Sequence, residues 1–348
     1  MRDKLSSTTL RAQHKMNNKV TLSHGNGGKH MRRLIEDVFQ KHLTNELLNT
    51  NSDAALLPDT NQHLMISVDG FTVQPVFFPG GDIGSLCIHG TVNDLAVSGA
   101  VPKFLTLGVI MEEGLLISTL EKIVKSLALA AKKCDVKIVC GDTKVVPRGE
   151  GSDIYFTTTG IGYKSSKNSY STELIQPGDK ILMSGSVGDH GAAIMLAREE
   201  FGLSGNLISD SASVLDLCQS IYDLDGVHFM RDPTRGGIAS VLHEINQASG
   251  LGVQVNETSI PVRKEVSTIC EMLGYEPYYL ANEGRVVAIV DANIAEQVLS
   301  RWKQIPNGES AVIIGEVTDQ HQEVVLQTAL GGERLLDELS ENPLPRIC

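Results

Sequence analysis

Apolar and polar positions follow two different periods along this chain. Short apolar runs with β-branched residues predict strands at 63–68, 102–111, 136–140, 154–161, 180–184, 285–291 and 311–317. Helical spacing predicts helices at 31–44, 85–98, 115–133, 192–200 and 238–249. Because strands and helices alternate, we expect an α/β (α+β) fold.

A polar, serine-rich stretch at 164–171 divides this pattern in two, and we place a domain boundary there. We expect an N-terminal domain at 20–165 and a C-terminal domain at 174–334. The leader, 1–19, lacks the apolar core of a secretory signal and is expected to be disordered. The last segment, 335–348, is expected to form a mobile tail.

Charge and cysteine content argue against a nucleic-acid-binding, membrane-spanning or disulfide-bonded protein. The formal net charge of the 348-residue chain is −12, which argues against a nucleic-acid or anionic-membrane partner. No apolar run approaches the ~20 residues of a membrane span. The six cysteines form no C-x-x-C pair, and most lie among apolar or small residues, so we favour buried reduced thiols over metal ligands and expect a cytoplasmic protein.

Four acids form the main candidate site. Asp69 and Asp142 follow predicted strands, Asp53 precedes small residues, and Asp94 lies in an apolar stretch, where a buried carboxylate needs a partner or a metal. Mg²⁺ is usually held by a few carboxylates together with substrate phosphates, and Lys144 would add a positive charge there. For each acid alone, a solvated turn residue is the alternative interpretation.

Two glycine-rich segments could bring backbone amides to an anion. Gly27 and Gly28 precede a predicted helix, and Gly236 and Gly237 begin another. The first segment lacks the spacing of the G-x-x-x-x-G-K-[ST] phosphate loop, so an ordinary loop is the alternative.

The chain ends in a cysteine that follows two prolines. Pro343 and Pro345 predict an extended, semi-rigid arm with the Cys348 thiol at its tip. Such a thiol could be loaded in one place and processed in another. The alternative is an accidental cysteine on a frayed end.

Several long motifs resemble those of the HypE family, the carbamoyl dehydratases of nickel–iron hydrogenase maturation. The resemblance runs from about Val20 to the end of the chain. Its motifs are His24-Gly25-x-Gly27-Gly28, Phe78-Pro79-Gly80-Gly81-Asp82-Ile83-Gly84, Gly90-Thr91-Val92-Asn93-Asp94-Leu95-Ala96, Gly141-Asp142-Thr143-Lys144-Val145-Val146, Arg231-Asp232-Pro233-Thr234-Arg235-Gly236-Gly237, Asn282-Glu283-Gly284 and Pro345-Arg346-Ile347-Cys348. The wider superfamily includes aminoimidazole ribonucleotide synthetase and selenophosphate synthetase.

The resemblance implies a two-domain PurM-like ATP-binding fold whose N-terminal sheets pair across a homodimer. It also implies a reaction. In this reaction HypF would load a carbamoyl group onto Cys348, and ATP would phosphorylate the carbamoyl oxygen. Loss of a proton from nitrogen together with loss of phosphate would then leave a thiocyanate. The cyano group would pass to iron on a HypC–HypD complex.

The same resemblance suggests roles for individual residues, with ATP and Mg²⁺ as cofactors. The expected catalytic residues are Cys348, Lys144, Glu283 and His89. The expected ATP-binding residues are Gly27, Gly28, Asp53, Asp69, Asp94, Gly141, Asp142, Lys144, Arg235, Gly236 and Gly237, and the expected metal ligands are Asp53, Asp69, Asp94 and Asp142. Glu283 would take the nitrogen proton, with a plain turn acid as the alternative, and His89 would orient the tail, with a core histidine as the alternative.

Two other functions remain open at this stage. One is a superfamily kinase or synthetase that acts on a free small substrate, for which Cys348 would be dispensable. The other is an ATP-gated scaffold for hydrogenase assembly that binds ATP without consuming it.

Overall fold

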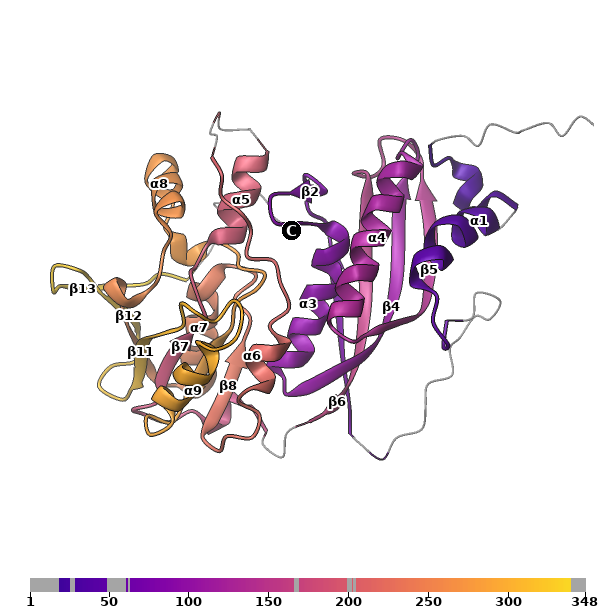
Figure 1. The fold of residues 1–348 in the computed structure, drawn as a ribbon. Coiled ribbons are helices and arrows are strands. Elements are labelled where there is room, and N and C mark those ends of the chain that lie inside the picture. Colours follow the sequence, from indigo (N-terminus) through magenta and orange to yellow (C-terminus); the bar gives the residue numbers. More distant parts are fainter. Residues whose placement is uncertain are drawn as a thin grey trace, which may run out of the picture.

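Two β-sheets, each with its own helices, form the protein (Figure 1). The computed structural model describes residues 19–25, 29–48, 61, 63–165, 169–198, 202 and 205–338. The two sheets use residues 64–164 and 180–335, and the predicted mixed α/β architecture is confirmed.

The first sheet has four strands in the order β1-β6-β4-β5. Their bounds are β1 Leu64–Phe71, β4 Ala100–Glu112, β5 Lys137–Val146 and β6 Ile154–Lys164. The strands β4 and β5 are parallel, and the other two pairs are antiparallel. The strand predicted at 154–161 could have closed the sheet at its edge. Instead β6 lies inside it, because it pairs with β1 on one side and β4 on the other.

Two predicted strand ends, those of 63–68 and 136–140, lie inside longer strands. Asp69 is the sixth residue of β1, and Gly141, Asp142 and Lys144 continue β5 rather than forming a loop. The reason is pairing, because β4 offers partners as far as Glu112 and so extends β5 to Val146.

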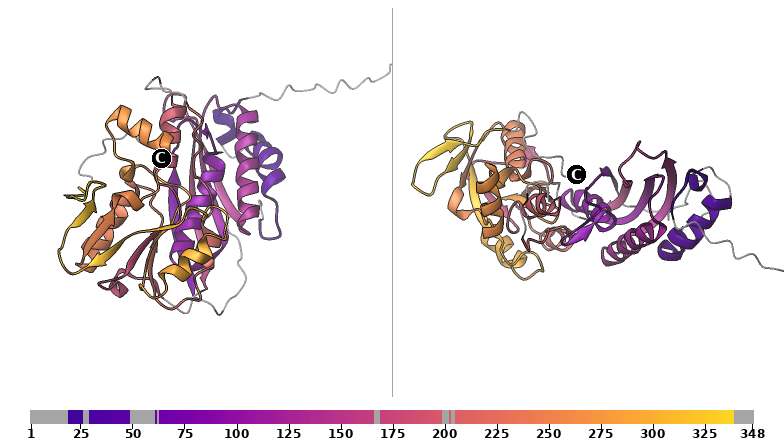
Figure 2. Two further views of the ribbon diagram at one scale, coloured as in Figure 1. Left: turned by 60° about the vertical axis from the view of Figure 1, so that its left-hand side comes forward. Right: turned by 90° about the horizontal axis from the view of Figure 1, so that it is seen from above.

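Two long helices cover one face of the first sheet. They are α3 Ile83–Val97 and α4 Ile117–Lys133. Asp82 caps α3 by accepting hydrogen bonds from the amides of Gly84 and Ser85, which satisfies two donors that a helix start leaves unpaired. The view from above in Figure 2 shows this helix layer on one side of the sheet only.

The second sheet has seven strands in the order β13-β12-β9-β11-β7-β10-β8. Their bounds are β7 Lys180–Met183, β8 Val227–Arg231, β9 Gly252–Asn256, β10 Val287–Val290, β11 Val312–Thr318, β12 Val324–Gln327 and β13 Glu333–Leu335. The β10 strand is buried along its whole length, which explains why its sequence is continuously apolar.

The remaining elements are short. The helices of the second domain are α5 Asp189–Ala197, α6 Leu215–Gln219, α7 Gly237–Ser249, α8 Lys264–Leu273 and α9 Ala295–Trp302. The N-terminal helical segment runs as α1 Lys29–Leu34, a π turn Ile35–Gln40 and α2 Lys41–Leu43. Single 3-10 turns are η1 Leu22–Gly25, η3 Thr172–Leu174, η4 Glu257–Ser259 and η5 Pro277–Tyr279.

A small hairpin ties the first domain to the second. Its strands are β2 Phe77–Phe78 and β3 Gly81–Asp82, beside α5 in Figure 1. The Phe78 ring packs edge-on against His190 with the ring centres 5.4 Å apart, and the Pro79 carbonyl accepts the Ser209 amide at 2.9 Å. One hydrophobic core cluster contains residues of both domains, so the two pack as one body.

Among the described residues, no helix is long and apolar enough to span a membrane. Five cysteines are described, and all are free. Cys140 is half-buried and the other four are buried, as expected for reduced thiols.

Candidate functional site

Asp69 and Asp94 lie together on the helix-covered side of the first sheet. Asp94, near the end of α3, accepts a hydrogen bond from the Ser67 hydroxyl on β1 at 2.7 Å. Burial raises the pKa of Asp69, and the Asp94 carboxylate raises it further. Burial also raises the pKa of Asp94. Two carboxylates that repel one another form a site suited to a cation.

The end of β8 and the loop after it bring a third acid and two arginines to this pair. Asp232 is buried, and burial, followed by the charge of Asp94, raises its pKa to about 7. Arg235 Nη2 lies 3.6 Å from Asp69 Oδ1. The positive charges of Arg231 and Arg235 lower the pKa of Asp94. We call Asp69, Asp94 and Asp232 the acidic cluster.

Glu283 is buried beside this cluster at the junction of the domains. Its carbonyl accepts a hydrogen bond from Asn93, the residue before Asp94, at 3.4 Å. Asp210 accepts the amides of Glu283 at 3.3 Å and Gly284 at 3.2 Å. Position 284 has to be glycine, because a Cβ there would lie 2.0 Å from the Asp210 carbonyl oxygen. This loop is therefore held rigidly next to α3.

Asp142 and Lys144 lie on the opposite face of the first sheet. Both side chains are exposed, and their charged atoms are 3.3 Å apart, whereas Thr143 between them is buried under the helices. Side chains alternate along a strand, so Asp142 points away from the face that carries Asp69.

The strand register separates these two groups further. Asp142 pairs with Gly108 on β4, Gly108 with Thr157 on β6, and Thr157 with Gly70 beside Asp69. Three strand spacings amount to about 14 Å. Within one chain, Asp142 therefore cannot share one metal ion with Asp69 and Asp94, and the expected four-acid ligand set is corrected in this respect.

His89 lies on another side of α3 from Asp94. The two are five positions apart, which turns the side chains about 140° apart around the helix axis. Burial, with a smaller effect from Lys133, lowers the pKa of His89 to about 4. This environment matches the core histidine that we kept as the alternative.

The remaining predicted site residues divide between the helix α7 and parts of the chain outside the described residues. Gly236 precedes α7 and Gly237 begins it, both with positive φ. A Cβ on Gly237 would lie 2.4 Å from the Tyr278 carbonyl oxygen, so the second glycine is required for packing. Gly27, Gly28, Asp53 and Cys348 lie outside the described residues.

No three His, Cys, Asp or Glu side chains within the described ranges are arranged to hold a metal ion by themselves. Asp69 and Asp94 nevertheless provide the hard oxygen donors that Mg²⁺ uses when phosphates complete its coordination. The donor set therefore fits a magnesium ion bound together with a phosphorylated ligand.

Asp232 and Asp210 are the acids that our sequence reasoning missed as site residues. Asp232 was present in the Arg231–Gly237 motif, and its position before a proline was the available signal. Asp210 lies in an irregular segment with no periodicity, and only the fold brings it to Glu283.

Comparison with known protein families gives the class of this two-domain fold. Residues 51–163 match the N-terminal domain of AIR synthase related proteins, and residues 176–327 match the C-terminal domain of the same family. The mixed α/β fold of this chain is that of the AIR synthase related family.

Closer relatives define the family. A carbamoyl dehydratase HypE from Azotobacter vinelandii is 43% identical over 334 residues, which cover 95% of this chain and 98% of the relative. A crystal structure of the hydrogenase maturation protein HypE in complex with ATP has a TM-score of 0.90 at 44% identity and covers 94% of this chain and 99% of that one. A HypE–HypF complex has a TM-score of 0.77 at 44% identity, covering 88% and 99%. The chain belongs to the HypE family and is a carbamoyl dehydratase.

Proposed function

We propose that this enzyme uses ATP to dehydrate a carbamoyl group carried on the sulfur of Cys348, and so makes the thiocyanate that supplies the cyanide ligand of nickel–iron hydrogenase. The observation that carries the proposal is the link between Glu283 and the acidic cluster. Consecutive residues of α3 provide it, because Asn93 contacts Glu283 and Asp94 belongs to the cluster. The Glu283 backbone is therefore fixed beside a phosphate-binding candidate, and the carboxylate carried by this residue would serve as the proton acceptor.

Each group has a role that its chemistry supports. A carbamoyl oxygen is a weak nucleophile, so the γ-phosphate must be held in line with it. Asp69 and Asp94 would hold Mg²⁺, which when bound neutralises phosphate charge. Lys144 would place a further positive charge on the phosphate, the amides at Gly236 and Gly237 would meet phosphate oxygens, and Glu283 would accept a proton from nitrogen.

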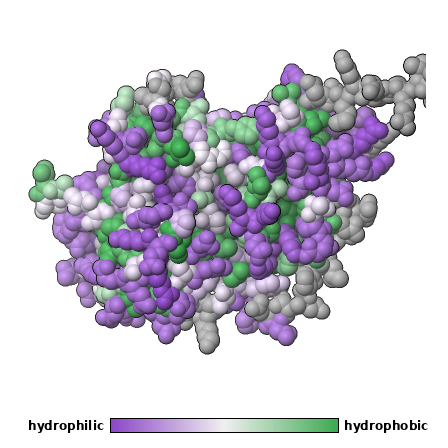
Figure 3. All heavy atoms as spheres, viewed as in Figure 1, coloured by the Kyte–Doolittle hydropathy of each residue, from purple (hydrophilic) through white to green (hydrophobic). Residues whose placement is uncertain are grey.

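We further propose that a homodimer completes this site. The open face of the first sheet carries Ile66 and Val68 on β1, 68% and 67% exposed, together with Leu64 and Ile110. The helix-covered side in Figure 3 is largely hydrophilic, with separate hydrophobic patches. Among the described residues, β1 is an edge strand of this sheet. An apolar sheet face next to such an edge favours a partner sheet, and a second copy provides one.

The proposed dimer also gives Asp142 and Lys144 a place in the site, although they lie far from Asp69 and Asp94 in a single chain. These residues lie on the same open face as Ile110, their neighbour on β4. The strands β1 and β5 are the two edges of the sheet. If two open faces pair with β5 of one chain beside β1 of the other, Lys144 of one chain would reach past that edge towards Asp69 of the other. This is our explanation for candidate residues that lie about 14 Å apart in a single chain.

The proposed partners follow from the family. The carbamoyl donor would be HypF and the cyanide acceptor a HypC–HypD complex, in the cytoplasm. The net charge of −12 is consistent with the absence of a nucleic-acid partner.

Coupled release of ADP tests this proposal. Carbamoylated protein should convert one ATP per carbamoyl group, whereas protein that HypF has not loaded should release almost no ADP. A Cys348→Ala variant should retain ATP binding and lose the coupled release. Steady ADP production by the Cys348→Ala variant with a free small substrate would favour the kinase or synthetase alternative.

A further inference from the structure

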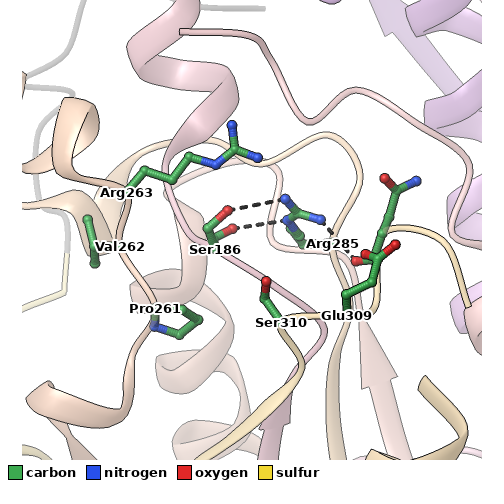
Figure 4. Close-up of a pocket in the computed structure, with 8 residues that line it drawn as sticks. Ser186, Pro261, Val262, Arg263, Arg285, Glu309 and Ser310 are labelled. Carbon is green, nitrogen blue, oxygen red and sulfur yellow. Dashed lines mark hydrogen bonds between the residues drawn. The ribbon is translucent and has the colours of Figure 1, made fainter. Parts of the chain in front are cut away.

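A cavity of about 290 Å³ opens in the second domain and uses none of the acidic-cluster residues (Figure 4). Its polar lining comes from four separate segments, namely Ser186, Arg263, Arg285 and the loop with Asn307, Glu309 and Ser310. Pro261 and Val262 form an apolar wall. A volume of this size lies at the lower end of small-molecule sites, which suits a small metabolite.

Arg285 forms the floor of this cavity and is fixed in place. Its side chain is 7% exposed and donates to the Ser186 carbonyl at 3.0 Å and to the Asn307 carbonyl at 3.1 Å. Its Nη2 contacts the Ser186 hydroxyl and the Asp189 carboxylate. A guanidinium has five N–H groups, and these contacts leave one on Nη1 for a ligand.

Arg263 lies at the rim and keeps more of its donors. Its Nε lies 3.2 Å from Asp189 Oδ2, and its side chain is 47% exposed. In the described part of the chain, neither Nη atom of Arg263 has a hydrogen bond or an ion pair. Four N–H groups are therefore available beside the one on Arg285, in the fork geometry that binds an oxyanion.

Glu309 adds a negative charge to the cavity, which favours a cationic group of a ligand, whereas the arginines favour an oxyanion. Figure 4 shows Glu309 and Arg263 on opposite sides of the Ser186–Arg285 pair. The Glu309 carboxylate contacts no donor or cation within the described ranges. Arg263 and Arg285 are balanced by Asp189 and Asp210, so Glu309 makes the local charge negative and opposes a bare polyanion.

We propose that this cavity binds a small zwitterion, with its carboxylate or phosphate on Arg263 and Arg285 and its ammonium group on Glu309. The ammonium group of such a ligand matches the Glu309 carboxylate, and its oxyanion matches the N–H groups of Arg263 and Arg285 that their acids leave available. The ligand thereby receives directional donors for its oxyanion without the repulsion that Glu309 would impose on an anion alone.

Arg263 and Glu309 are better positions for a test than Arg285. Arg285 Nε also lies 3.6 Å from Asp210, which holds the Glu283 loop, so a change there would disturb the proposed catalytic site. Lys264 provides a matched control, because it is an exposed cation next to Arg263 that does not line the cavity.

Titration calorimetry of the full chain at low ionic strength tests the proposal. The probes are phosphoethanolamine and β-alanine as zwitterions with the two oxyanion types, and inorganic phosphate as the anion alone. At least one zwitterion should bind with a dissociation constant of about 1 mM or tighter. Arg263→Ala should weaken its binding about tenfold, and Lys264→Ala should leave it unchanged.

Glu309→Gln separates a zwitterion site from a general anion site. It should weaken binding of the zwitterion while leaving inorganic phosphate as it was or tighter. Absence of binding by both zwitterions, equal loss in Arg263→Ala and Lys264→Ala, or an unchanged zwitterion affinity in Glu309→Gln would each overturn the proposal. None of these outcomes depends on the dehydration reaction.

Discussion

At the scale of single residues, the three carboxyl groups of the acidic cluster differ in how their charges are compensated. Asp94 has the Ser67 hydroxyl and Asp69 has Arg235, whereas Asp232 is buried and has its pKa raised to about 7. A cation on Asp69 and Asp94 would reduce the repulsion among all three.

Asp94→Asn and Asp142→Asn should each weaken Mg–ATP binding while the protein stays folded. Each change removes an anionic oxygen from the proposed phosphate and metal environment, and about tenfold is expected. Calorimetric titration with ATP in the presence of Mg²⁺ measures the effect. Asp319→Asn, an exposed turn acid, is the control, and parental ATP affinity in both test variants would remove them from the metal and nucleotide site.

Lys144→Ala and Glu283→Gln should accept the carbamoyl group normally and dehydrate it slowly. Loading needs an accessible thiol and the donor protein, whereas dehydration needs phosphate stabilisation and a proton acceptor, each worth about 100-fold or more. Quenched time courses followed by mass spectrometry separate the two steps. A variant that dehydrates at the parental rate would have no catalytic role.

The residue identities at the site were more predictable than their grouping. Long motifs placed Asp69, Asp94 and Glu283 among the candidates, and the structure gathers these three near the domain junction. Asp142 is separated from them by the order of the strands and by the alternation of side chains between the two faces of the sheet. Sequence periodicity gives neither, because pairing between distant strands decides both.

At the scale of elements, the long strands of the first domain were predictable and the short ones were not. The apolar runs of β4 and β6 are distinctive, whereas β2 and β3 have two residues each and no period to detect. These short strands nevertheless form the hairpin that holds the domains together, through Phe78 and His190.

His190 should make the stability of this hairpin contact pH-dependent. Burial lowers the pKa of His190 to about 3 from the usual 6.5. Between these two pH values His190 is protonated in the unfolded state and neutral in the folded state, so acid favours unfolding. The contribution of neutral His190 is complete above pH 6.5 and is lost as the pH falls below it. His190→Gln should therefore destabilise the protein at pH 7.5.

The cost of His190→Gln should shrink in acid by about 1.4 kcal/mol per pH unit, which is about 2 kcal/mol by pH 5. Urea unfolding of both proteins at several pH values measures it. His63→Gln is the control, because His63 is exposed. A cost that is the same at pH 7.5 and pH 5 would show that His190 does not titrate in this way.

At the scale of the whole molecule, the proposed dimer joins the two faces of the first sheet into one site. Mixed dimers test this arrangement. At an ATP concentration below saturation, Asp94→Asn and Lys144→Ala chains should each have about a tenth of the parental dehydration rate or less when alone. If one site takes Asp94 from one chain and Lys144 from its partner, a mixed dimer has one intact site and one site with both changes.

Co-expression with two different affinity tags isolates that mixed dimer. It should recover about half of the parental dehydration rate, since one of its two sites is intact. A mixed dimer that is as inactive as either parent variant would place both residues in the same chain's site. Light scattering that finds only monomer at micromolar concentration would contradict the dimer itself.

The central claim is that a carbamoyl group on Cys348 loses the elements of water in an ATP-dependent step. Mass spectrometry of the C-terminal peptide tests it most directly, after loading by HypF and with or without Mg–ATP. We predict that the carbamoylated peptide loses the mass of one water only when ATP is present. A peptide that keeps its carbamoyl mass with ATP, or a modification found on Cys140 instead of Cys348, would contradict the account.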